Sequence, residues 1–519
     1  MLSEAAGKPP ITAVLAPRGR LLSPVWLNAL SIATACAFAA GLPFVAFTRL
    51  ILFHFYTRGS FLLDSGLLGF LLWHNDIALT KPESVGSGSF FATHMSPLFL
   101  LTGLLSRVVP CSMPQYFAGF IGFSHALLAL AIFWLLVEGY GLRRGAAPWL
   151  AVLVAVAFAF SGLAIAIARY PHFETLIAAF FLLFAVAQRL GHTRLAIVFF
   201  VAGLLTREDA GLHYLAILGL LAVLNCARGI PLVRQRANLI FALAGASYVI
   251  VIMIFQHSVF PGDSSFARVY LGEPPLAHMT ASLMANRFLY FIINRPYVLL
   301  PAIGACLWAA RTRDPNILLG YAAAAPWLGL NLMAESSFAG ALASYYAFPF
   351  LIALAWPLLA ASRPRQTAVK QAVHPIAAFA ALLALTFVPA VDIHDPGRLP
   401  LPRAFLQAPS LAQQTAIDRA VAAISAARPA LGRLLADNSI AALDPAGFAR
   451  EQVPALDGPD GAADTVAFFS EGYDADRLRA LAENDGLVRR YAVPGTPLHL
   501  ASRLPLDSVP ELGRLLGAD

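Results

Sequence analysis

The chain has 519 residues, of which 59% are hydrophobic and only 13% are charged, and its formal net charge is +7. Its apolar stretches are repeatedly long enough to cross a hydrocarbon core, which takes about 20 residues, so the sequence predicts a polytopic membrane protein. The basic residues lie in short clusters between these stretches, where they act as topology signals, and nucleic-acid binding is excluded. The four cysteines are scattered singly, which excludes a disulfide framework and a thiolate metal site.

The hydrophobic pattern predicts an all-α transmembrane domain over 25–391. Its eleven expected spans are roughly 25–53, 117–140, 148–168, 173–188, 194–206, 210–226, 237–256, 296–310, 316–333, 344–362 and 373–391. The loops on one side carry fifteen basic residues, and the longer segments on the other side carry eight. By the positive-inside rule, the tail 1–24 is therefore cytoplasmic and the segment 392–519 is outside.

The first outer segment, 54–95, contains FLLDSGLLGFLLWHNDIAL (61–79), whose helical spacing predicts an amphipathic helix on the membrane surface. Asp64 would then lie at the boundary between water and lipid, where a partly desolvated carboxylate suits a general base that deprotonates an acceptor hydroxyl. An equally weighted alternative makes Asp64 the N-cap of this helix. The sequence does not decide between these roles.

His94 precedes a short apolar run, 96–109. If this run crossed the membrane, the basic loops that follow it would lie outside, in conflict with the positive-inside rule. We therefore expect a re-entrant or interfacial helix that begins and ends outside. A histidine beside a helix start is more often a local hydrogen-bonding residue than a functional one. His94 is nevertheless a candidate for the wall of a substrate pocket.

The motif ARYPHFETL (168–176) joins two spans with hardly any loop between them. Tyr170, His172 and Glu174 should therefore lie at or just below the outer surface and point into a shared cavity, because neither His172 nor Glu174 can face lipid cheaply. The alternative is a His/Glu pair that only stabilises a tight helical hairpin.

The motif LLTREDAG (204–211) lies between two unusually short spans. The turn that carries Arg207, Glu208 and Asp209 should therefore lie below the outer surface in a water-accessible pocket. Arg207 would neutralise one acid internally, and the second acid favours a functional role.

Several outer residues are candidates for binding a substrate. Arg107 and Arg268 would suit a phosphate, and Ser344, Tyr345 and Tyr346 begin a later apolar run. His, Asp and Glu together would suit a divalent cation, but no HxxxH or DxD spacing supports one. Neither a metal nor a cofactor is therefore predicted.

From residue 392 the long apolar runs stop, and this segment holds twelve arginines, no lysine and seventeen acidic residues. Residues 411–427 and 474–485 have helical spacing, and 465–470 and 488–493 resemble short strands. The segment 392–519 is long enough to bury its own core, so we expect a small periplasmic α/β domain.

Five motifs in this order resemble a bacterial and archaeal membrane family, that of domain of unknown function 2079. They are DSGLLGFLLW (64–73), HMSP (94–97), YPHFE (170–174), TREDAG (206–211) and SYYAFP (344–349). The chain departs from the family pattern at Gly69-Phe70, where a polar pair is usual, and at Phe173. The family is in turn similar in layout to the GT-C glycosyltransferases. That resemblance implies that Asp64 corresponds to their catalytic aspartate.

The leading hypothesis is a glycosyltransferase of the bacterial inner membrane. It would move a sugar from a polyprenyl-phosphate-linked donor to a glycan, lipid or protein acceptor at the periplasmic face. One alternative is a transporter or flippase for a lipid-linked or polar solute, with the acids as proton relays. A binding module on a membrane anchor is a third, but it leaves recessed acids such as Glu208 unexplained.

Overall fold

The computed structural model describes residues 24–58, 62–86, 88–261, 266–342, 344–361, 369–387, 407–448, 463–472 and 474–516. The predicted cytoplasmic tail up to residue 23 and the predicted start of the C-terminal domain at 392 lie outside these residues. The side chains of Arg268 and Ser344 also lie outside them.

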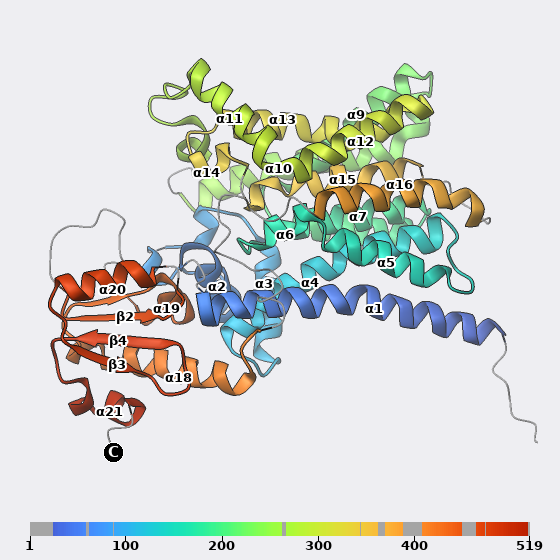
Figure 1. Ribbon diagram of the computed structural model, residues 1–519. Helices are drawn as coiled ribbons and strands as arrows, with labels where there is room; N and C mark the ends of the chain where they lie inside the picture. Colours follow the sequence, from blue (N-terminus) through green and yellow to red (C-terminus); the bar gives the residue numbers. More distant parts are fainter. Residues whose placement is uncertain are drawn as a thin grey trace, which may run out of the picture.

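The N-terminal three quarters of the chain is helical, and its longer helices run roughly side by side (Figure 1). The helices are α1 (Pro24–Phe53), α2 (Leu67–His74), α3 (Pro97–Gly103), α4 (Met113–Trp134), α5 (Ala147–Ala159), α6 (Gly162–Ala168), α7 (Thr175–Arg189), α8 (Thr193–Leu204), α9 (Ala210–Ala227), α10 (Arg236–Val259), α11 (Ala281–Asn294), α12 (Pro296–Thr312), α13 (Leu319–Met333), α14 (Ser337–Gly340), α15 (Pro349–Ala361) and α16 (Val369–Phe387). Every span expected from the sequence overlaps at least one of these helices.

The lengths of these helices do not settle how many times the chain crosses the membrane. Within the described ranges, four helical segments are long and apolar enough to cross, or up to six if two bent pairs each form one span. The bends are 48° between α5 and α6 and 80° between α11 and α12. The chain is a helical membrane protein, and the number of eleven crossings stays a prediction.

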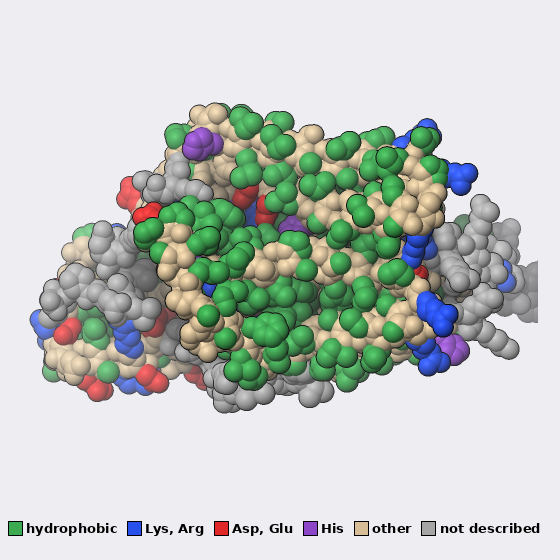
Figure 2. Space-filling model, turned by 90° about the horizontal axis from the view of Figure 1, so that it is seen from above, with side chains coloured by type: hydrophobic (Ala, Val, Ile, Leu, Met, Phe, Trp, Pro, Cys, Tyr) green, Lys and Arg blue, Asp and Glu red, His purple; other side chains and the backbone are tan. Residues whose placement is uncertain are grey.

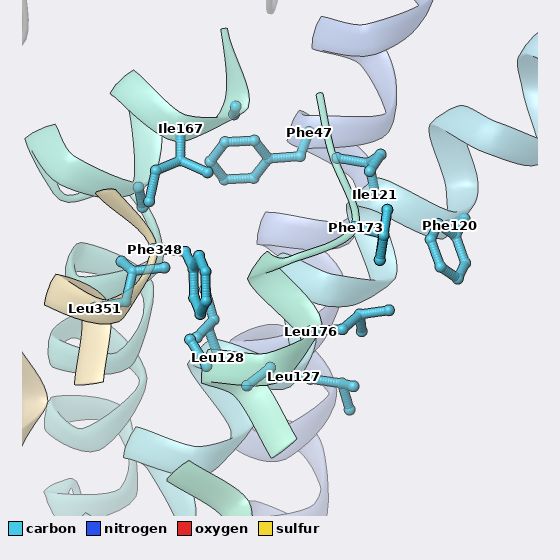
Figure 3. Packing of buried hydrophobic residues seen from close by; sticks show 14 of the residues in the cluster. Phe47, Phe120, Ile121, Leu127, Leu128, Ile167, Phe173, Leu176, Phe348 and Leu351 are labelled. Carbon is cyan, nitrogen blue, oxygen red and sulfur yellow. The ribbon is translucent and has the colours of Figure 1, made fainter. Parts of the chain in front are cut away.

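The interior of the membrane part is closely packed where helices from distant parts of the sequence meet. Figure 3 shows Phe47 of α1, Ile121 of α4 and Leu176 of α7 among the buried side chains. A glycine lets α1 and α4 approach closely, because a Cβ added at Gly122 would lie 2.6 Å from the Phe44 carbonyl oxygen. Small residues commonly allow helices to pack in this way within membranes.

The segment expected to form a surface helix has a different structure. It consists of a π-helical turn, Leu62–Gly66, followed by the short helix α2, which ends at Asn75 in a left-handed conformation (φ 45°). Leu68, Leu71 and Leu72 are buried, and α2 packs against α4. The amphipathic surface helix over 61–79 is therefore wrong in length and in environment. Its sequence is apolar all round, which is typical of a buried helix.

The C-terminal part is a small α/β unit at one end of the helical bundle (Figure 1). Its elements are α18 (Leu411–Ala427), β1 (Leu434–Ala436), α19 (Asn438–Leu443), β2 (Thr465–Phe469), α20 (Ala475–Asn484), β3 (Arg489–Ala492), β4 (Leu498–Ser502) and α21 (Pro510–Leu516). The sheet order is β1-β2-β4-β3, with β1 parallel to β2 and the other pairs antiparallel. The expected helices α18 and α20 and strands β2 and β3 are confirmed, whereas β1 and β4 were not foreseen.

The C-terminal unit packs against the first outer segment. The Tyr56 hydroxyl donates to Asp418 Oδ2 at 3.1 Å, and burial raises the pKa of that carboxyl to about 6. Helix α19 packs on the turn Leu62–Gly66, where a Cβ added at Gly66 would lie 2.8 Å from Ala442 Cα. The turn that carries Asp64 is thus held between the membrane part and the C-terminal unit.

Candidate functional site

Five separate segments bring polar side chains together at the end of the bundle that the positive-inside rule predicts to face outward. Asp64 comes from the turn before α2, His94 from the loop before α3, and the others from the turns that precede α7, α9 and α15. We call this group the outer polar cluster: Asp64, His94, Tyr170, His172, Glu174, Arg207, Glu208, Asp209, Tyr345 and Tyr346. Each was a candidate from the sequence, and the structure places them in one network.

The deepest part of the cluster is a charge-paired group. Glu174 is fully buried and accepts hydrogen bonds from His172 Nδ1 and Arg207 Nη1. The Arg207 guanidinium also binds both oxygens of Asp209, with Nε 2.6 Å from Oδ1. Buried acids need partners of this kind, because an uncompensated charge is costly there. We call His172, Glu174, Arg207 and Asp209 the floor of the cluster.

Glu208 is held separately from the floor. Its carboxylate lies 3.0 Å from His94 Nδ1 and accepts the backbone N–H of Met95 at 2.9 Å. Burial opposes the charged imidazole, but the Glu208 carboxylate outweighs it and raises the pKa of His94. The backbone N–H of Leu98 donates to the Leu205 carbonyl oxygen at 2.8 Å. The start of α3 is therefore tied to the turn between α8 and α9, and this positions His94.

Asp64 lies at the edge of the cluster in a different environment. It accepts a hydrogen bond from the Tyr170 hydroxyl, and among the described residues no arginine or lysine forms an ion pair with it. Burial raises the pKa of the Asp64 carboxyl, against the smaller opposing effect of His172. Asp64 does not cap α2, because the N-cap position is Gly66. We call Asp64 and Tyr170 the rim of the cluster.

Aromatic rings line the side of the cluster next to the rim. The Tyr345 ring stacks on His172 with centroids 4.2 Å apart and on Tyr346 at 4.4 Å. The Tyr170 ring lies 6.1 Å from Tyr345. The Asp64 carboxylate therefore lies next to a layer of aromatic side chains, which we call the aromatic wall: Tyr170, Tyr345 and Tyr346. Such rings combine a large apolar face with a polar edge, which suits a partner that is apolar on one side and hydroxylated on another.

Arg107, which was expected to bind phosphate, does not join this network. Its side chain is exposed, and Nη2 donates to the Asn75 carbonyl oxygen at 3.3 Å. The sequence suggested Arg107 as a phosphate ligand only because it is basic and lies in a segment expected to face outward. These two properties do not determine where its side chain points. Within the described ranges, no group of three or more His, Cys, Asp or Glu residues is arranged to hold a metal ion.

Two residues that the sequence analysis did not single out adjoin the cluster. His213 of α9 interacts electrostatically with Asp209 and Arg207, and Tyr248 of α10 interacts with Glu208 and Asp209. His213 Nε2 and the Tyr248 hydroxyl are buried without a hydrogen-bond partner. Unpartnered buried polar atoms usually mark a place for water or a ligand. The spacing of four residues from Asp209 could have identified His213, whereas no local pattern marks Tyr248.

One side of the bundle has a hollow that contains polar side chains. Figure 2 shows acidic, basic and histidine side chains inside a hollow on a face that is otherwise covered mainly by hydrophobic side chains. Near the cluster, α3 and the turn after it expose Leu101, Leu104 and Val108. A polar chamber that opens through an apolar face suits an amphipathic ligand whose apolar part stays in lipid.

Comparisons with known proteins add little to this geometry. No protein-family model and no curated protein match the sequence, so the family resemblance drawn from its motifs stays a prediction. Among solved structures, the chain is similar to that of ArnT from Cupriavidus metallidurans bound to undecaprenyl phosphate. The two share 11% sequence identity over 92% of this chain and 98% of that chain, with a TM-score of 0.45. A likeness at this level does not assign a function, which must come from the site.

Proposed function

We propose that the chain is a membrane glycosyltransferase with a GT-C-like layout that uses a polyprenyl-phosphate-linked sugar at the outer face. The observation that carries the proposal is the contrast within one cluster between Asp64 and the other acids. Glu174 and Asp209 bind Arg207, and Glu208 binds His94, whereas Asp64 accepts a neutral hydroxyl. A carboxylate that forms no ion pair with an arginine or lysine, and whose pKa is raised by burial, keeps its basicity and can take up a proton.

In the proposed reaction, Asp64 takes the proton of an acceptor hydroxyl as its oxygen forms a bond to the anomeric carbon of the sugar. The bond between that carbon and the phosphate oxygen breaks, and the lipid phosphate leaves with the electron pair. Arg207 uses three of its N–H groups on Glu174 and Asp209. The remaining N–H groups and His172 would stabilise the negative charge that develops on the leaving phosphate.

The surroundings of the hollow suit a donor with a long isoprenoid chain. Its hydrocarbon part would remain against the exposed apolar side chains of α3, and its phosphate and sugar would enter the hollow. Tyr345 and Tyr346 of the aromatic wall would pack on the sugar ring, and the unpartnered atoms of His213 and Tyr248 would bind its hydroxyl groups. This arrangement satisfies polar atoms that are otherwise buried without partners.

A transporter with this fold would need a path for its substrate through the bundle. An aromatic layer lies inward of the cluster: the Tyr214 ring is 4.9 Å from Phe181, 5.3 Å from Phe184 and 4.9 Å from Phe200. Transport would require this layer to open, whereas sugar transfer at the outer end would not. The transporter hypothesis therefore requires a movement of this layer that sugar transfer does not require.

The test is turnover by the purified protein in lipid nanodiscs with a panel of radiolabelled polyprenyl-phosphate sugars. We expect at least one donor to release its lipid phosphate, and we expect Asp64→Asn to abolish this release. Asp76→Asn is the matched control, because Asp76 lies in the same outer segment and accepts the Thr80 backbone N–H at 2.8 Å outside the cluster. No turnover of any donor, together with flux of a donor or solute across the bilayer, would support the transporter instead.

A further inference from the structure

A second polar cavity lies at the opposite end of the bundle from the outer polar cluster. Its volume is about 300 Å³, and it is lined by α7, α9, α10, α15 and the turn Pro315–Leu318 and is partly open to the surface. Helix α7 joins the two sites, because Glu174 precedes its first residue and Arg189 is its last. Fifteen helical residues separate these positions by about 22 Å. The cavity is therefore separate from the proposed catalytic site.

The cavity has an apolar part and a polar part. Phe181, Phe184 and Leu218 contribute the apolar surface, and Arg189 and Asn238 contribute polar groups. The Gln188 amide nitrogen donates to Asn238 Oδ1 at 2.8 Å, which leaves the amide nitrogen of Asn238 for another acceptor. Arg189 and Asn238 thus offer a cation and a neutral donor side by side, a combination that suits a phosphate oxygen.

The polar part also has an acceptor that lacks a donor. Asn316 Oδ1 is buried without a hydrogen-bond partner, although the Asn316 carbonyl oxygen accepts the Trp356 indole N–H at 2.8 Å. An unpartnered acceptor beside a cationic donor matches a phosphate group that carries a neighbouring hydroxyl.

The charge around the cavity favours an anion. Asp314 interacts electrostatically with Arg189 but is itself paired with Arg228, whose Nη2 lies 3.0 Å from Asp314 Oδ1. Figure 2 shows basic side chains gathered at the end of the molecule away from the C-terminal unit, which lies at the other end in Figure 1. Basic pockets between helices on the cytoplasmic side commonly bind anionic lipid headgroups.

We infer that this cavity binds the headgroup of an anionic phospholipid of the cytoplasmic leaflet. Arg189 and Asn238 hold the phosphate, Asn316 accepts a headgroup hydroxyl, and the acyl chains begin along Phe181 and Phe184. A hydroxylated phosphodiester such as phosphatidylglycerol has all of these features. The inference does not depend on the proposed transferase activity, because none of these residues belongs to the outer polar cluster.

The test measures lipid binding to the full chain by native mass spectrometry and thermal stabilisation in detergent. We expect phosphatidylglycerol to bind and stabilise the protein, and phosphatidylcholine not to displace it. Arg189→Gln should weaken phosphatidylglycerol binding about ten-fold, because it removes a charge-assisted hydrogen bond. Arg194→Gln is the matched control, since Arg194 is an exposed arginine on the same side at the start of α8.

Leu218→Trp fills the cavity and leaves Arg189 in place, and we expect it to abolish phosphatidylglycerol binding as well. This second variant keeps the test decisive if Arg189→Gln fails to fold. Equal binding of phosphatidylglycerol to the wild type and to both cavity variants would overturn the inference. Full competition by soluble glycerol phosphate would show a free phosphate site instead of a lipid site. Displacement of phosphatidylglycerol by phosphatidylcholine would remove the role of the charge.

Discussion

The floor and the rim of the outer polar cluster both contain acidic side chains, but these have different partners. At the floor, Glu174 and Asp209 are tied to Arg207, and Glu174 is fully buried. At the rim, Asp64 accepts a hydrogen bond from a tyrosine hydroxyl, and among the described residues it forms no ion pair with an arginine or lysine. The carboxylates of the floor are paired with an arginine, and we assign them to holding the fold. The carboxylate of the rim is not, and we assign it to the chemistry.

The floor also holds two of the five segments of the cluster together. Arg207 bridges the turn before α7 and the turn before α9, which are separated in sequence and meet only through helix packing. The rim is positioned from outside the bundle, by α19 of the C-terminal unit. We therefore expect changes at the floor to act on stability first and changes at the rim to act on turnover first.

The largest expected effect on stability follows removal of the floor cation. Arg207→Met leaves Glu174 and Asp209 without their shared partner, and breaking a buried pair in this way costs about 3–5 kcal/mol. Thermal unfolding of the purified protein measures the loss. Arg143→Met is the control, because Arg143 pairs with Glu138 at the surface and such pairs contribute about 0–1 kcal/mol. Equal losses in the two variants would contradict the assignment of the floor.

The acid side of the pH–rate profile tests the rim. A base must be ionised to act, so turnover should fall as the pH decreases through the pKa of Asp64, by about ten-fold for each pH unit below it. Burial raises this pKa, so the fall should begin above the ordinary aspartate value of about 3.9. The measurement is kcat/KM against pH for the wild type and for Asp64→Glu. An acidic limb that is identical in both would assign the titrating group elsewhere.

The unpartnered groups beside the floor should affect substrate binding. Tyr248→Phe removes a hydroxyl that has no protein partner, so thermal stability should stay the same or increase. His213→Ala removes the unpartnered Nε2 together with the ring contacts to Trp327 and Phe348, so it should also lower stability. If these atoms bind the sugar, KM should rise by about ten-fold. Tyr290→Phe on the exposed part of α11 is the control. A loss of stability with unchanged KM would make both residues structural.

The smallest expected effect is on the contact that holds the C-terminal unit. Burial raises the pKa of Asp418 to about 6, so this carboxyl binds its proton more tightly in the folded protein than in the unfolded chain. A carboxyl whose pKa is raised by folding stabilises the contact most at low pH and loses this contribution as the pH rises through about 6. The protection of α18 amides against hydrogen exchange, corrected for the intrinsic exchange rate at each pH, should therefore decrease modestly between about pH 4 and pH 7.

Asp418→Asn keeps an acceptor for Tyr56 and removes the titration, so the corrected protection of α18 in this variant should not change with pH in the same range. Asp476→Asn changes an exposed aspartate of the same unit and serves as the control. A pH response that persists in Asp418→Asn would show that another group controls the contact.

Much of the cluster was predictable, because short connections between spans leave little freedom. His172, Glu174, Arg207 and Asp209 had to lie near the outer surface, and their proximity follows from the packing of neighbouring helices. Their pairing was not predictable. Arg207 and Asp209 are two residues apart, but the bond from Arg207 to Glu174 depends on how α7 and α8 lie together.

The failures also have physical causes. The apolar run around Leu68 and Leu71 reads as a surface helix when Asp64, His74 and Asp76 are taken as its polar face, but α4 buries its leucines. Arg107 lies on the expected side and bonds a backbone carbonyl instead of joining the cluster. Strand β1 has only three residues, all buried, so no alternation marks it in the sequence.

The most direct test of the contrast between rim and floor measures Asp64→Asn in three ways at once: turnover, donor affinity and thermal stability. We expect turnover to fall by about 10²–10⁴-fold, because the variant lacks its general base. Donor affinity and unfolding temperature should stay close to those of the wild type, because Asn keeps an acceptor for Tyr170. A variant that keeps its turnover, or that loses donor binding and stability together with turnover, would contradict the account.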